Sequence, residues 1–101
     1  MIIRVFRAIV HDGKQQEFEE FFLNQAVPHV KSQAGLIELT VGKPHPSSPN
    51  EFLMTMLWKD LESVKGFAGD NWQQAVILAD EKQLIKEVFV HHYELAVIVD
   101  N

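Results

Sequence analysis

Three residues that could carry acid-base chemistry stand together near the end of the sequence: His91, His92 and Tyr93. Histidine titrates near neutral pH and can act as a general base, and a tyrosine hydroxyl can donate a hydrogen bond to a substrate oxygen. Adjacent residues of a strand point to opposite faces of a sheet, so only one histidine can face a given pocket, and the sequence leaves open which one. The alternative is a structural role for each of these side chains, with its polar atoms satisfied in the sheet or at an interface.

Other residues could line or polarise a pocket near these three. Trp72 could roof a pocket and donate from its indole nitrogen, and the preceding Asn71 could cap a helix or reach a ligand with its amide. Arg7 interrupts an apolar strand, where it could hold a substrate oxyanion or pair with an acid across the sheet, and we favour the pairing. Trp58 and Phe67 are candidate walls of an apolar substrate site, with filling of the core as the alternative.

Composition excludes several classes of function. The chain of 101 residues has no cysteine, and its five histidines lack the spacing of a metal site, so we expect neither a metal nor a cofactor. The formal net charge is -5 and the basic residues are scattered singly, which argues against nucleic acid as a partner. No apolar run suits a signal peptide or a membrane span, so we expect a cytoplasmic protein that does not bind a membrane.

The candidate residues are positioned by alternating strands and helices in a single domain, residues 1–101. Strands are predicted over residues 2–10, 36–41, 52–58 and 87–99, and helices over residues 14–33, 60–67 and 71–79. Pro28 should kink the first helix or end its first part, and Asp60 should cap the second. This order predicts an α+β fold of the ferredoxin-like βαββαβ type, an antiparallel four-stranded sheet with the helices on one face.

Both faces of the predicted strands are apolar, which a sheet with one solvated face would not be. The first strand carries Ile3 and Val5 on one side and Phe6 and Val10 on the other. A second copy of the chain, packed sheet against sheet, is the simplest cover for the second face, so we expect a symmetric homodimer. The alternative is that the second face closes over a ligand within one chain.

The sequence resembles the antibiotic biosynthesis monooxygenase family of the dimeric α+β barrel superfamily over nearly its whole length. The resemblance is carried by residues 5–13, the phenylalanine-rich first helix, residues 35–37 and, above all, residues 56–64, Met-Leu-Trp-Lys-Asp-Leu-Glu-Ser-Val. It implies a quinol monooxygenase-like enzyme that oxidises aromatic phenols or quinols with molecular oxygen and needs no metal, flavin or haem. Such chemistry asks for an apolar cavity, a general base and a donor that steadies an oxyanion.

A second branch of that superfamily degrades haem with an asparagine, a tryptophan and a histidine. The approximately corresponding positions here are Phe6, Phe67 and Ile77, so the resemblance does not extend to haem degradation. Our hypothesis is a cofactor-independent monooxygenase acting on a small aromatic phenol or quinol. The alternative is a non-catalytic dimer of the same fold that binds a ligand or is structural.

Overall fold

An antiparallel sheet of four strands forms the centre of the computed structural model, which describes residues 1–79 and 81–100. The strands are β1 (Ile2–Val10), β2 (Leu36–Gly42), β3 (Glu51–Trp58) and β4 (Ile85–Glu94), in the spatial order β2-β3-β1-β4. β1 is central and pairs antiparallel with β3 and β4, with Phe6 opposite Met54 on one side and Val90 on the other. The predicted ferredoxin-like sheet is confirmed.

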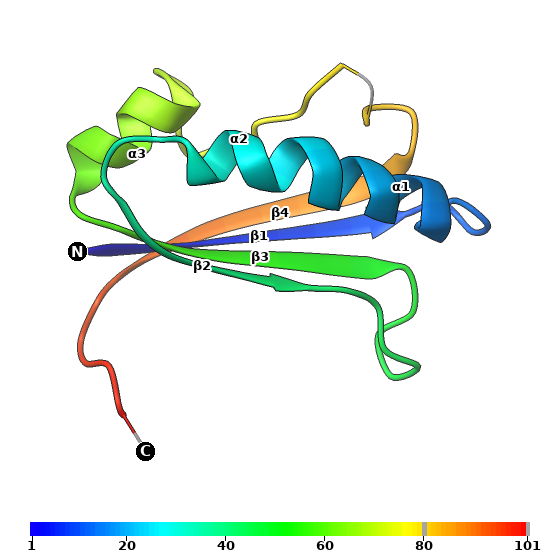
Figure 1. Cartoon of the computed structure of the whole chain (residues 1–101), viewed down its shortest axis with the longest axis horizontal. Coiled ribbons are helices and arrows are strands. Elements are labelled where there is room, and N and C mark those ends of the chain that lie inside the picture. Colours follow the sequence, from blue (N-terminus) through cyan, green and yellow to red (C-terminus); the bar gives the residue numbers. More distant parts are fainter. Residues whose placement is uncertain (80, 101) are drawn as a thin grey trace.

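The helices all lie on one face of this sheet (Figure 1). The first is one helical run made of α1 (Gln15–Phe21), a π-helical segment η1 (Phe22–Ala26) and α2 (Val27–Lys31). Pro28 is the second residue of α2, just after η1; proline has no N–H to donate, and the wider π-helical turn before it accommodates that loss. The other helix, α3 (Leu61–Ala68), is capped by Asp60, whose Oδ1 accepts from the backbone N–H of Ser63 at 2.8 Å. In the described part of the chain, none of the helices has the length and apolar character that a membrane crossing requires.

One predicted helix does not form, and one predicted strand is shorter than expected. Residues 71–79 form turns and an irregular stretch instead of a helix. The carbonyl oxygens of Trp72 and Gln74 accept from a side chain, Arg4, and not from N–H groups of a following helical turn. The last strand ends at Glu94 and not at Val99, because Glu94 lies opposite Ile2, the first residue of β1. Beyond that point β1 has no residues left to pair with the end of the chain.

The core lies between the helices and the face of the sheet that they cover. Even-numbered residues of β1 and β3, among them Phe6, Ala8, Phe52 and Met54, are buried there. The rings of Phe18 and Phe52 meet at 4.8 Å between centroids and fill the core beneath α1. Each buried phenylalanine or methionine among them stabilises the fold by about 1.5–3 kcal/mol, so this packing holds the helices on the sheet.

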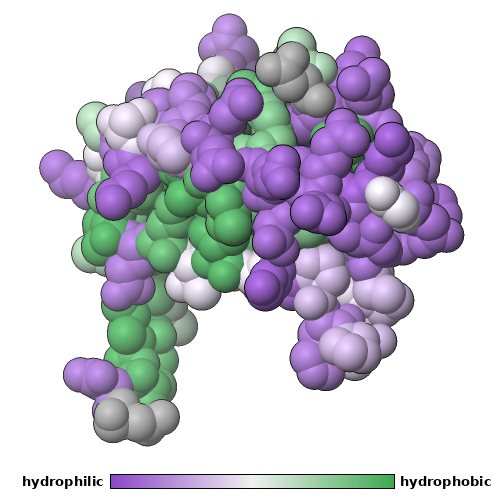
Figure 2. All heavy atoms as spheres, turned by 45° about the vertical axis from the view of Figure 1, so that its right-hand side comes forward, coloured by the Kyte–Doolittle hydropathy of each residue, from purple (hydrophilic) through white to green (hydrophobic). Residues whose placement is uncertain are grey.

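In residues 1–79 and 81–100, no helix covers the opposite face of the sheet. Its residues on β1, such as Ile3 and Val5, are only half-buried, and Tyr93 on β4 is 54% exposed. After β4 the chain leaves the sheet on this side and runs away from the body (Figure 1). We call residues 95–99 the C-terminal tail; Figure 2 shows its apolar side chains standing clear of the molecule, with Val97, Ile98 and Val99 among the most exposed large apolar residues.

Candidate functional site

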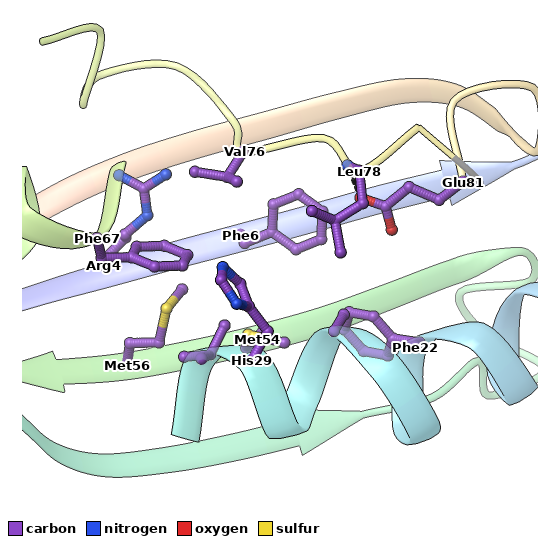
Figure 3. A pocket seen from close by; sticks show the side chains of 12 residues that line it. Arg4, Phe6, Phe22, His29, Met54, Met56, Phe67, Val76, Leu78 and Glu81 are labelled. Carbon is purple, nitrogen blue, oxygen red and sulfur yellow. Dashed lines mark hydrogen bonds between the residues drawn. The ribbon is translucent and has the colours of Figure 1, made fainter. Parts of the chain in front are cut away.

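A cavity opens within the helix-covered layer, between the sheet, α2, α3 and the irregular segment that follows α3. Most of its walls are apolar side chains, and three residues are polar: Arg4, His29 and Glu81. The full lining is Arg4, Phe6, Phe22, Ala26, His29, Val30, Met54, Met56, Phe67, Val76, Leu78 and Glu81 (Figure 3). The space between the walls, including the mouth, is about 420 Å³, of which the centre of a water molecule can reach about 40 Å³. That is room for roughly three waters, so the cavity is a narrow slot that admits only a small molecule.

Arg4 is a buried cation at one end of this cavity. Its side chain is 1% exposed, and Nη2 donates to the carbonyl oxygen of Gln74 at 3.0 Å while Nη1 donates to that of Trp72. Among the described residues, no carboxylate forms an ion pair with Arg4, and its buried Nε–H has no hydrogen-bond partner. Burial lowers the pKa of Arg4 to about 10, which leaves it cationic at neutral pH. The site therefore places an uncompensated positive charge beside an apolar slot, and one buried N–H of that cation has no partner among the described residues.

His92 is the histidine that faces the helices, and it contacts Arg4 from outside the cavity. Its Nε2 lies 2.9 Å from Arg4 Nη1, and because an arginine can only donate, we assign Nε2 as the acceptor and place the proton on Nδ1. Burial lowers the pKa of His92, and the positive charge of Arg4 and the neighbouring His91 lower it further, so the ring is neutral at pH 7. The indole of Trp72 meets the imidazole edge to face at 4.9 Å. His92 and Trp72 thus hold Arg4 in place and do not themselves line the cavity.

Three aromatic rings lie together beside Arg4. Phe67 lines the cavity with its centroid 5.6 Å from the guanidinium carbon of Arg4, a distance at which a cation is attracted to the ring. Behind it Trp58 is fully buried and stacks on Phe67 at 5.3 Å, so Trp58 supports the wall from the core. His29 reaches Phe67 from α2 at 5.9 Å and lies between solvent and the cavity (Figure 3).

Several candidates from the sequence lie away from the cavity. His91 and Tyr93 point to the face of the sheet without helices, as does Arg7, whose Nε donates to Glu51 Oε2 at 2.6 Å. Arg7 therefore makes the ion pair that was the favoured interpretation, and its guanidinium also lies over Phe89 at 4.9 Å. Asn71 is exposed in a turn, where its carbonyl oxygen accepts from Gln74 N–H at 2.9 Å, so it caps no helix. The structure brings His92, Trp72, Trp58 and Phe67 together around Arg4.

The polar residues of the cavity were missed at the level of sequence. Arg4 and Arg7 are an odd number of residues apart on one strand, so the sequence already places them on opposite faces of the sheet. Because both faces are apolar, the sequence does not show that the helices cover the face of Arg4. Glu81 follows an irregular stretch and resembles an ordinary turn acid, yet it is 3% exposed. His29 is exposed on α2, as a polar helix residue usually is, and only the structure shows that its ring also borders the cavity.

Comparison with protein families gives a match to the model described as antibiotic biosynthesis monooxygenase over residues 1–76. The chain belongs to this family. The matched range runs from β1 to the irregular segment after α3 and so includes Arg4, Phe67 and Trp72. Comparison with curated protein sequences finds no match.

Solved structures of the antibiotic biosynthesis monooxygenase fold agree with this assignment. A protein of that name from Deinococcus radiodurans superposes with a TM-score of 0.75 at 18% identity, covering 100% of this chain and 98% of its own. SnoaB from Streptomyces nogalater, a cofactor-independent oxygenase, superposes with a TM-score of 0.73 at 16% identity, and the match covers 99% of this chain and 97% of SnoaB. MhuD, solved with manganese protoporphyrin IX in its active site, superposes with a TM-score of 0.73 at 14% identity, and the match covers 100% of both chains. At these identities the likeness shows the fold alone.

Proposed function

We propose that the protein is a cofactor-independent monooxygenase that oxidises a small aromatic phenol or quinol with molecular oxygen inside this cavity. Its family supports a monooxygenase. The observation that carries the proposal is Arg4, a buried cation that retains a free Nε–H at the end of an apolar slot. In such surroundings a cation stabilises a bound phenolate far more than it would in water.

Arg4 would therefore favour ionisation of the bound hydroxyl group. A cation beside a phenol lowers the pKa of the phenol, because it stabilises the anion. His29 borders the same cavity and meets solvent on its other side, so it can take up the phenolic proton and pass it to water. The neighbouring phenylalanine and methionine side chains keep bulk water from the anion.

The anion can then reduce oxygen without help. It passes one electron to O₂, and the resulting superoxide and phenoxyl radical join at a ring carbon to form a C–O bond. Loss of water, with the hydrogen of that ring carbon leaving as a proton, gives a quinone. One oxygen atom stays on the ring and the other leaves as water, and the substrate supplies all four electrons.

Oxygen uptake with a panel of hydroquinones tests this function, and the chain offers a matched control. Arg4 and Arg7 lie on the same strand and face opposite sides of the sheet. One charge-assisted hydrogen bond is worth about 1.5–3 kcal/mol, so Arg4→Met should lower the rate by about 10- to 150-fold, while Arg7→Met should keep it. If oxygen uptake is no faster than in buffer with every hydroquinone, the protein is not a catalyst of this reaction. If Arg4→Met and Arg7→Met lower the rate equally, the reaction does not take place in this cavity.

We also propose that a second copy of the chain covers the open face of the sheet. Ile3 and Leu57 on that face form a shallow hollow with Leu95, Val97 and Ile98 of the C-terminal tail, and Glu38, Thr40 and Thr55 add polar groups to its lining. The tail lies on the same side as the open face, so a two-fold pairing would bury both surfaces of each copy at once (Figure 1). Sedimentation at micromolar concentration should therefore give twice the monomer mass of 11.6 kDa. A particle of 11.6 kDa would overturn the dimer.

A further inference from the structure

We propose that Glu81 determines specificity at the end of the cavity opposite Arg4, where its carboxyl group binds a hydroxyl group on the far end of the ligand. The oxygen of the ligand that Arg4 holds and the hydroxyl that Glu81 holds would then lie at the two ends of one flat ring system. Glu81 acts in the same cavity as the proposed oxygenation, and in that respect this proposal rests on the proposed function.

The position of Glu81 is fixed by its own backbone. Its N–H donates to the carbonyl oxygen of Leu78 at 3.1 Å, and its carbonyl oxygen accepts from the N–H of Leu84 at 2.9 Å, just before β4 begins. The side chain turns back, and Oε1 accepts from the N–H of Leu78 at 3.0 Å. In residues 1–79 and 81–100, the second carboxyl oxygen, Oε2, has no hydrogen-bond partner. One carboxyl oxygen is therefore bound by the backbone at the cavity, and the other is left without a bond to any described residue.

The two buried ionisable groups of the cavity do not meet. Arg4 and Glu81 lie at opposite ends with Phe6 between them (Figure 3), and they form no ion pair in the described part of the chain. An acid that is 3% exposed is ordinarily paired, because an unpaired buried carboxylate is costly. Burial raises the pKa of Glu81, against the opposing effect of the Leu78 N–H. The other ionisable groups that face it across the cavity are Arg4 and His29.

A ligand hydroxyl satisfies Glu81 in either protonation state. The carboxylate would accept from the hydroxyl, and the carboxylic acid could donate to it as well. A methyl group of the same size would instead leave Oε2 without water and without a partner, which costs more than the bond itself is worth. The cavity should therefore discriminate hydroxyl from methyl at this end of a ligand by about tenfold.

Equilibrium binding of two probes without oxygen tests the proposal. 4-Hydroxybenzoate and 4-methylbenzoate share a carboxylate for Arg4 and nearly the same shape, and they differ in the group that would reach Glu81. Calorimetry should show about tenfold tighter binding of the hydroxyl compound to the wild type. Glu81→Gln should keep this preference because its amide still forms hydrogen bonds, and Glu81→Leu should abolish it. Glu87→Leu, which changes an exposed acid on β4, should behave as the wild type.

Several outcomes would overturn the role of Glu81. Equal affinity of the wild type for both probes would do so without any variant, as would failure of both to bind. A preference that survives in a folded Glu81→Leu would assign the discrimination to another residue. Since binding requires no turnover, a protein that discriminates the probes but consumes no oxygen would refute only the oxygenation. Turnover combined with Glu81-independent discrimination would refute only this proposal.

Discussion

Replacing Arg4 with methionine tests whether the buried guanidinium also holds the irregular segment after α3. The substitution removes polar contacts to Trp72, Gln74 and His92, each worth about 1.5–3 kcal/mol for a charged donor. It also removes the cost of burying the cation. That cost is about 3 kcal/mol, because burial lowers the pKa from 12.5 to about 10. We expect a net loss in the free energy of unfolding of about 3 kcal/mol. A domain of this size has about 5–15 kcal/mol, so the variant should still fold.

Arg7→Met is the matched control for this loss. The side chains of Arg7 and Glu51 are 39% and 25% exposed, and an ion pair of this kind contributes about 0–1 kcal/mol. Urea unfolding followed by circular dichroism, at one protein concentration for all variants, gives both values. If Arg4→Met costs no more than Arg7→Met, Arg4 does not anchor the segment.

The remaining predictions concern pH and the turn before β2. The pKa of His92 is lowered in the folded state, so the unfolded chain binds more protons below about pH 6.5 and stability falls as the pH drops through that value. His92→Gln keeps an acceptor for Arg4 and should flatten this dependence in urea titrations at several pH values, whereas an unchanged slope would exclude His92 as its source. Gly35 has a φ of 88°, and a Cβ there would overlap the side chain of Ser63. Gly35→Ala should therefore lower the free energy of unfolding by about 1–3 kcal/mol through backbone strain alone, and the overlap with Ser63 should add to this loss. Ser63→Gly should relieve the overlap in the double variant. If the thermal shifts of the two single variants simply add in the double variant, the side chains do not overlap.

The sheet and its helices could be predicted because local patterns agree with the final packing. β1 is rich in β-branched and aromatic residues, β3 is almost uninterruptedly apolar, and Asp60 supplies a helix cap that is visible in the sequence. Residues 71–79 misled because their apolar spacing is close to that of a helix, while the groups that bind their carbonyl oxygens lie on Arg4, about seventy residues away in sequence. Local periodicity contains no information about such a contact.

The site was only partly predictable for a related reason. Parity placed His91 and His92 on opposite faces, but choosing between them required knowing which face the helices cover, and both faces are apolar. The register settles it, because His92 lies opposite Arg4 and both point toward the helices. Glu81 could not be found from the sequence, since its burial depends on the path of the segment before β4.

The most direct measurement of the central claim follows the two arginine side chains themselves. Arg4 and Arg7 are the only two arginines of the sequence, so an isotope-labelled protein gives two arginine Nε–H signals in a nuclear magnetic resonance spectrum. The signal that disappears in Arg7→Lys belongs to Arg7. A hydroquinone titrated in without oxygen should shift the Arg4 signal, because the free Nε–H gains a partner, and should leave the Arg7 signal in place. Movement of the Arg7 signal alone would put the ligand on the open face of the sheet and contradict the site proposed at Arg4.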